Sequence, residues 1–127
     1  MSEIKFKAKR LNNQEWVFGN LRTSKSGNSM IIPIEYEGAC SVDPSTVCQF
    51  TGARDCDGTP IYEHDLLICR EIERVYEVVW NQDNTSFSLY NAKHNVLYTS
   101  TLGIMLHHSH YSFKVIGNKF DKKGGKV

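Results

Sequence analysis

The sequence predicts a mainly β protein, built as a strongly bent sheet or small barrel with at most short helices. Short segments that alternate apolar and polar residues recur along the chain, and this pattern is typical of strands with one buried face. Clusters of Gly, Asn, Asp and Ser separate these segments and favour turns. The chain has 127 residues, 40% hydrophobic and 23% charged, which are the proportions of an ordinary globular domain.

We expect a single domain with three parts: a β part over about residues 1–50, a barrel-like part over about 51–120, and a flexible basic tail at 121–127. Pro33 should lie at a strand end or on an edge strand, because proline cannot donate to the sheet. The first part should contain strands at Ile4–Ala8, Glu15–Gly19 and Met30–Ile34, a capped single turn at Asp43–Thr46, and an extended segment at Cys48–Thr51.

In the second part, Asp55–Gly58 predicts a tight hairpin turn, because Asp-Gly readily adopts positive φ. Strands should follow at Leu66–Cys69, Val75–Trp80, Thr85–Tyr90 and Phe113–Asn118. In the third of these, Phe87 and Leu89 should share one face of the sheet. The stretch from Thr101 to Leu106 fits either a short helix or a loop.

The sequence favours a protein that stays in the cytoplasm. Its first residues lack the apolar core of a signal peptide, and no apolar run approaches the roughly 20 residues that cross a bilayer. The four cysteines, Cys40, Cys48, Cys56 and Cys69, form no C-x-x-C pair. We therefore expect free thiols; the rival interpretation is a zinc site completed by histidines.

Charge is distributed unevenly along the chain. From Glu35 to Glu77 there are ten acidic residues and three arginines, a net charge of −7, while the remainder carries twelve basic and four acidic residues, a net charge of +8. Basic residues near the start, such as Lys5 and Lys7, would attract phosphate if they gathered on one face with the basic tail. Alternatively, these lysines only keep strand edges soluble and unpaired.

Four segments carry a resemblance to a known family: Ile4–Ala8, Val42–Gly52, Asp57–Leu67 and Val115–Asn118. Together they resemble the YopX family of phage and prophage proteins, over nearly the whole chain, and the two central segments are the specific ones. The resemblance implies a β-rich fold with an SH3-like barrel portion and a phage or prophage origin. It supplies no catalytic residues. The family pattern has glycine where this chain has Cys48 and His64, so we expect either negative φ or strain at these positions.

Candidate catalytic and metal-binding groups are few. His107, His108 and His110 are the candidate metal ligands, although their spacing matches no known metal motif and a polar loop is the alternative. His64 could act as a base beside Glu63 or Asp65, but neighbouring residues in a strand point to opposite faces. A cysteine nucleophile would lie in an acidic segment, which opposes thiolate formation. We therefore expect no enzyme activity and no cofactor.

Aromatic residues supply the remaining candidates, either as core side chains or as a stacking platform for bases or a peptide. The predicted binding residues are Lys5, Lys7, Trp16, Tyr62 and Trp80. The sequence thus predicts a non-enzymatic accessory protein that binds a host or phage protein or assembles with itself. The alternative is a small β-barrel protein that binds nucleic acid. We expect no association with a membrane.

Overall fold

The computed structural model describes residues 5–33, 38–108 and 110–121, and these residues form a mainly β protein. The chain divides into two compact units, Met1–Phe50 (unit 1) and Thr51–Val127 (unit 2), each described by itself below. Most of the predicted basic tail, residues 122–127, lies outside the described residues.

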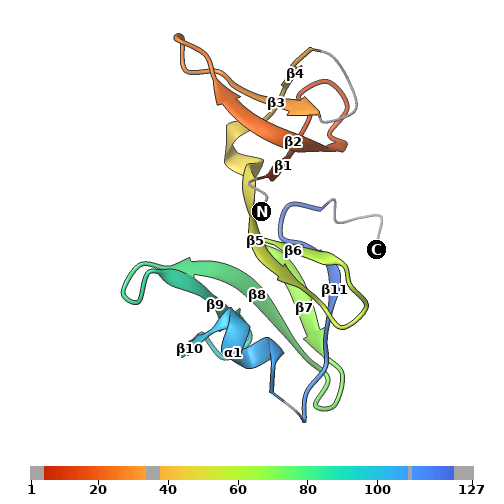
Figure 1. The fold of residues 1–127 in the computed structure, drawn as a ribbon, viewed down its shortest axis with the longest axis vertical. Helices are drawn as coiled ribbons and strands as arrows, with labels where there is room; N and C mark the ends of the chain where they lie inside the picture. Colours follow the sequence, from red (N-terminus) through yellow and green to blue (C-terminus); the bar gives the residue numbers. More distant parts are fainter. Residues whose placement is uncertain (1–4, 34–37, 109, 122–127) are drawn as a thin grey trace. The chain divides into compact units, whose positions relative to one another are not determined.

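Unit 1 contains an antiparallel sheet (Figure 1). Ala8 pairs with Val17 and forms a small core with Ile31 and Val42, because alternation in the first strand turns Ala8 inward. The second strand extends beyond its predicted end, since it pairs with the third as far as Thr23. In the order β4-β3-β2-β1-β5, the strands are β1 (Phe6–Lys9), β2 (Trp16–Thr23), β3 (Ser29–Pro33), β4 (Cys40–Ser41) and the start of β5 (Cys48–Arg54).

The capped turn predicted in unit 1 is confirmed as the 3-10 helix η1 (Pro44–Thr46). The Asp43 carboxylate accepts the N–H of Ser45 at 3.0 Å, and Pro44 occupies the first helical position. Thr46 Oγ1 accepts the N–H of Lys9 at 2.9 Å, which attaches the turn to β1.

Unit 2 begins with a hairpin of β5 and β6 (Pro60–Tyr62). Gly58 has a φ of +86°, and its N–H donates to the carbonyl of Asp55 at 3.0 Å, so the predicted tight turn is confirmed. A five-stranded antiparallel sheet follows in the order β10-β9-β8-β7-β11, with strands β7 (Asp65–Cys69), β8 (Arg74–Asn81), β9 (Ser86–Asn91), β10 (Val96–Thr101) and β11 (Phe113–Asn118).

Among the described residues, the core of unit 2 is larger than that of unit 1. The ambiguous stretch after Thr101 forms the short helix α1 (Leu102–Leu106), which contacts β9 and β10 (Figure 1). Leu102 anchors this helix in the core at 3% exposure. The buried members of the core are Ile61, Leu67, Cys69, Tyr76, Val78, Leu89, Leu102 and Phe113.

The predicted barrel requires a correction, because the strands do not close. Among the described strands, β10 and β11 end the second sheet and do not pair with each other. The chain between β10 and β11 forms α1 instead of a further strand. No hydrogen bonds between the described strands therefore join the two edges of this sheet. The described strands therefore form two open antiparallel sheets.

No helix within the described ranges is long and apolar enough to cross a membrane. No disulfide joins the four cysteines, and Cys48 and Cys69 are buried. Burial raises the pKa of the Cys69 thiol, which disfavours the reactive thiolate.

Candidate functional site

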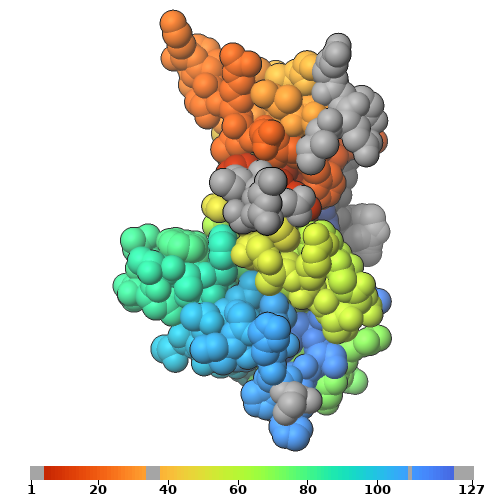
Figure 2. Space-filling view, in the orientation of Figure 1, coloured from red at the N-terminus to blue at the C-terminus, as the bar shows by residue number. Residues whose placement is uncertain are grey.

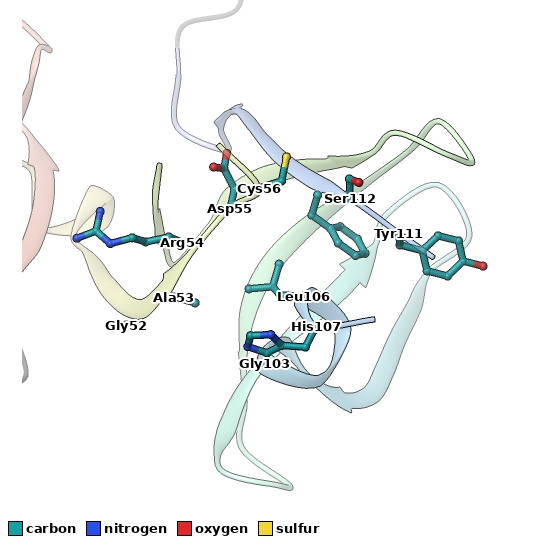
Figure 3. Close-up of a pocket in the computed structure, with 11 residues that line it drawn as sticks. Gly52, Ala53, Arg54, Asp55, Cys56, Gly103, Leu106, His107, Tyr111 and Ser112 are labelled. Atoms are coloured by element: carbon teal, nitrogen blue, oxygen red, sulfur yellow. The ribbon is translucent and has the colours of Figure 1, made fainter. Parts of the chain in front are cut away.

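A hollow of about 530 Å³ opens beside β5 and α1 in unit 2. Figure 3 shows Ala53 of β5 across from Leu106 of α1, with Cys56 and Ser112 at one end. Its volume lies within the roughly 300–1,000 Å³ of ordinary ligand pockets. This part of unit 2 therefore has room for a ligand.

A second hollow of about 240 Å³ continues the first, since both are lined by Gly52, Ala53 and Gly103. It extends to Phe87 of β9, whose ring packs edge-on against Trp80 at a centroid distance of 5.2 Å. In Figure 2 the surfaces of α1, in blue, and the β5–β6 hairpin, in yellow-green, adjoin on one face of unit 2. We call the two hollows the β5–α1 groove, defined by Gly52, Ala53, Arg54, Phe87, Gly103, Leu106 and His107.

Two glycines keep the walls of the β5–α1 groove bare. Gly52 has a φ of +87°, and a Cβ atom there would meet nothing within 4 Å. A Cβ atom on Gly103 would approach only Thr101 Oγ1, at 4.0 Å. Glycine inside a strand often marks a place where another backbone approaches closely. Both walls thus offer backbone rather than side chain to an occupant.

Asp55 fixes one end of the groove. Its Oδ2 accepts the N–H of Val115 at 2.9 Å, and its Oδ1 accepts the N–H groups of Asp57 and Thr59, each at 2.9 Å. Burial raises the pKa of Asp55, but the three backbone donors and the Lys114 charge outweigh it and lower the pKa below its usual value. The Asp55 carboxylate therefore stays ionised and joins the hairpin turn to β11.

The sequence-predicted residues Lys5, Lys7 and Trp16 lie together in unit 1. Lys7 Nζ lies 4.6 Å from the ring centre of Trp16, and Lys5 Nζ lies 4.7 Å from that of Phe50, both cation–π distances. Lys9 Nζ also approaches Trp16, at 5.5 Å. These five residues form what we call the lysine–aromatic face. Lys7 and Lys9 are only 8% and 5% exposed, which limits their access to a large anion.

The other two predicted binding residues belong to unit 2. Tyr62 is 4% exposed and lies next to Ile61 of the core, so its ring offers no open face. Trp80 is 45% exposed, and its indole N–H donates to Gln82 Oε1 at 3.0 Å. Only Trp80 of this pair is available to a partner.

His64 contacts a partner that the sequence analysis did not name. Its Nδ1 lies 2.8 Å from Oε2 of Glu77, whereas the neighbouring Glu63 is 3.8 Å from Nε2. Phe120 packs edge-on against the imidazole at 5.3 Å. The contact forms because Leu66 pairs with Glu77 across β7 and β8, and that register cannot be read from one strand alone.

The motif segments that carry the family resemblance meet around Asp65 in unit 2. Asp65 is 1% exposed, and its Oδ2 accepts the N–H of Tyr62 at 2.7 Å. Its Oδ1 accepts the side-chain N–H of Asn118 at 2.8 Å, which joins the start of β7 to the end of β11. These motif residues thus hold the fold together.

The histidine cluster does not gather into a metal site. His108 stacks on Tyr111 at a ring distance of 4.8 Å, and its ring lies 5.6 Å from that of His110. His107, His108 and His110 are exposed. Across the described part of the chain, no three His, Cys, Asp or Glu side chains converge as metal ligands would.

The family model of the YopX protein matches residues 5–123 of this chain. The match covers nearly the whole sequence, so the chain belongs to the YopX family. No curated protein matches the chain closely enough to count as a relative.

Proposed function

We propose that this YopX-family protein is a non-enzymatic accessory protein of phage or prophage origin that binds a protein partner through the β5–α1 groove. The observation that supports this proposal is the groove itself, which runs from Cys56 past Gly52 and Gly103 to Phe87. An exposed Trp80 stands beside it, and exposed aromatics are frequent anchors at protein interfaces. The proposal includes an SH3-like ancestry for unit 2 and action in the cytoplasm.

The polar groups around the groove favour binding over catalysis. Asp55 is engaged by three backbone N–H groups. Cys56 Sγ lies 3.9 Å from Nη1 of Arg70, and the His64–Glu77 pair has no place among the groove-lining residues. Acid–base or nucleophilic catalysis needs a base within hydrogen-bond reach of the group it activates. The lining of the groove is mixed, with the apolar side chains of Ala53, Phe87 and Leu106 beside the polar Arg54, Asp55 and Ser112.

A randomised peptide library displayed on beads and selected with the purified protein tests this function. Gly103→Gln should abolish the binding of selected peptides, because the glutamine side chain would occupy the groove. The variant should still fold, since glutamine favours a helix more than glycine does. Ile104→Gln is the matched control, since Ile104 is 63% exposed on the same helix and does not line the groove. Peptides that bind both variants equally, or a selection without binders, would contradict the proposal.

Nucleic-acid binding is the second candidate, and the lysine–aromatic face is the observation that favours it. Phosphate contacts by these lysines would release counterions, so affinity would fall steeply with salt. The test is fluorescence anisotropy of labelled single-stranded and duplex DNA and RNA at low and physiological salt. Lys5→Gln should weaken binding, because Lys5 is the least buried lysine of this face, and the turn residue Lys93→Gln should not. Absence of binding at low salt removes this candidate.

A further inference from the structure

A separate pocket of about 170 Å³ lies in unit 2, where β7, β8, β10, α1 and β11 come together. Of the described residues, it shares Tyr111 and Phe113 with the hollows of the β5–α1 groove, and the rest of its lining is its own. Figure 3 shows the ring of Tyr111 directed away from that groove. We call this space the tyrosine pocket and define it by Cys69, Tyr76, Tyr98, Met105, Tyr111 and Phe113.

Aromatic rings form much of the wall of the tyrosine pocket. The ring centroid of Tyr76 lies 5.6 Å from that of Tyr98 and 6.0 Å from that of Phe113. Tyr76 and Phe113 are each 3% exposed and belong to the core of unit 2, so the pocket reaches down to that core. Met105 adds a thioether, and its sulfur is a favourable neighbour for an aromatic ring. A guest in this pocket would therefore meet ring faces, ring edges and sulfur.

The charges around the tyrosine pocket favour a neutral guest. Burial and then the hydroxyl of Tyr98 raise the pKa of Tyr76 to about 12, against a smaller opposing effect of Arg74, so Tyr76 stays an uncharged phenol at neutral pH. Arg74 is exposed and is the one acidic or basic residue among the described residues of the lining. A cation would find no carboxylate there, and an anion would exchange water for apolar walls.

The volume of the pocket limits the size of its guest. Apolar protein cavities of about 150 Å³ hold a molecule of the size of benzene. At about 170 Å³, the tyrosine pocket has room for one such ring. The plane of Tyr76 is inclined by 50° to that of Tyr98 and by 61° to that of Phe113. Differently inclined walls suit an aromatic guest, because rings prefer offset or edge-to-face contacts.

We propose that the tyrosine pocket is a binding site for a single uncharged aromatic ring. The ring belongs to a free small molecule or to an aromatic side chain of a bound protein, and the two sources present the same chemistry. Burial of the apolar ring supplies the affinity, and contacts with Tyr76, Tyr98 and Phe113 select an aromatic ring over a saturated one. This site goes beyond the function proposed above and does not depend on the β5–α1 groove.

Three small compounds test the chemistry of the guest. p-Cresol carries the uncharged aromatic ring, 4-methylcyclohexanol is its saturated counterpart, and tyramine adds a positive charge. Titrations followed by NMR shifts of the full chain give affinity and location together. p-Cresol should shift the methyl group of Met105 and the amide of Tyr98. It should bind about fivefold tighter than 4-methylcyclohexanol, since aromatic pairs contribute roughly that factor beyond the area they bury. Tyramine should bind more weakly than p-cresol.

A fourth compound separates the two sources of the ring. N-acetyl-tyrosine methylamide carries the ring of p-cresol on a peptide backbone. If it shifts the same residues, the pocket admits an aromatic side chain of a bound protein. If p-cresol alone shifts them, the guest is a free small molecule. Both results support the site and assign its source.

Two substitutions in α1 test the location. Met105→Trp should weaken p-cresol binding by about tenfold or more, because the larger side chain fills the pocket. Ile104→Trp is the matched control, since Ile104 is 63% exposed and does not line the pocket. Gly103→Gln, which blocks the β5–α1 groove, should leave p-cresol binding unchanged.

A wall substitution keeps the test decisive if Met105→Trp fails to fold. Tyr98→Leu should retain binding but lose the preference for p-cresol over 4-methylcyclohexanol, because an aromatic wall becomes aliphatic. Equal affinity of the wild type for these two compounds, tighter binding of tyramine, shifts confined to residues outside the pocket, or no binding by any compound would each overturn the inference.

Discussion

At the residue scale, Asp55 shows how a carboxylate can join segments that are not paired strands, beside the backbone hydrogen bond from the Cys56 N–H to the carbonyl of Phe113. The β5–β6 hairpin and β11 are not neighbours in the strand order, yet Asp55 joins them through the N–H of Val115. Asp55→Ala should lower the free energy of unfolding by about 3 kcal/mol, because it leaves several backbone donors without an acceptor. Urea denaturation at neutral pH measures this loss. Asp57→Ala is the control, since its exposed contact with Lys114 should contribute less than about 1 kcal/mol.

The same residue predicts a dependence of stability on pH. The pKa of Asp55 is lowered in the folded state, so its contribution is complete above the ordinary value of 3.8 and disappears as the pH falls below it. The stability difference between the wild type and Asp55→Ala should therefore shrink between about pH 6 and about pH 2. A difference that grows over this range would contradict the ionised carboxylate.

Cys48 and His64 stand where the family pattern has glycine, and only His64 has the positive φ that favours glycine. Its φ is +69°, a conformation that favours glycine, whereas Cys48 has no positive φ and lies buried in β5. We therefore expect His64→Gly to be more stable than His64→Ala by about 1 kcal/mol, since both lose the Glu77 contact and only alanine keeps the strain. Thermal unfolding of the two variants side by side measures the difference, and an alanine variant as stable as the glycine variant would refute it.

At the scale of elements, the β5–β6 hairpin depends on Gly58. Its φ of +86° resists a β-branched side chain, so Gly58→Val should destabilise the protein by about 1 kcal/mol or more. Thr59→Val is a matched control, because it introduces the same side chain one residue later and should change stability by less than about 0.5 kcal/mol. Chemical denaturation of both variants compares them; similar midpoints would argue against strain at the turn.

Strands with clean alternation could be predicted from the sequence, and those with slipped register could not. Phe87 and Leu89 were expected on one face, and both pack against the core of unit 2. By contrast, β10 presents adjacent apolar residues, Val96 and Leu97, at 39% and 43% exposure, and its register against β9 shifts after Leu97. Such an irregular, exposed edge strand lacks the alternation of apolar and polar residues from which a strand is predicted.

The candidate site was the least predictable element of the structure. Gly52 and Gly103 face a common hollow although they are far apart in the chain, and neither glycine stands out in the sequence. Sequence reasoning named Trp80 as a binding candidate from its residue type alone, and its exposure appears only in the structure. It also selected Tyr62, whose burial depends on packing that composition cannot reveal.

At the scale of the whole molecule, the two units differ in the size of their cores. Within residues 5–33 and 38–50, the core cluster of unit 1 contains four buried hydrophobic residues, including Val17 and Ile31. The cluster in the described part of unit 2 contains eight, including Leu67 and Leu89. Because hydrophobic burial is the dominant favourable contribution to folding, unit 2 should be the more stable of the two.

The chain offers an internal reporter of this difference, since Trp16 lies in unit 1 and Trp80 in unit 2. In the Trp80→Phe variant, fluorescence follows unit 1 alone, and in Trp16→Phe it follows unit 2. We expect the Trp16 signal to change at a lower urea concentration than the Trp80 signal, because fewer apolar side chains hold unit 1 together. Far-UV circular dichroism of each variant supplies the control, since its overall transition should match between them. If the two fluorescence midpoints coincide with each other and with the circular dichroism, the chain unfolds as one cooperative unit and the ranking of the cores is wrong.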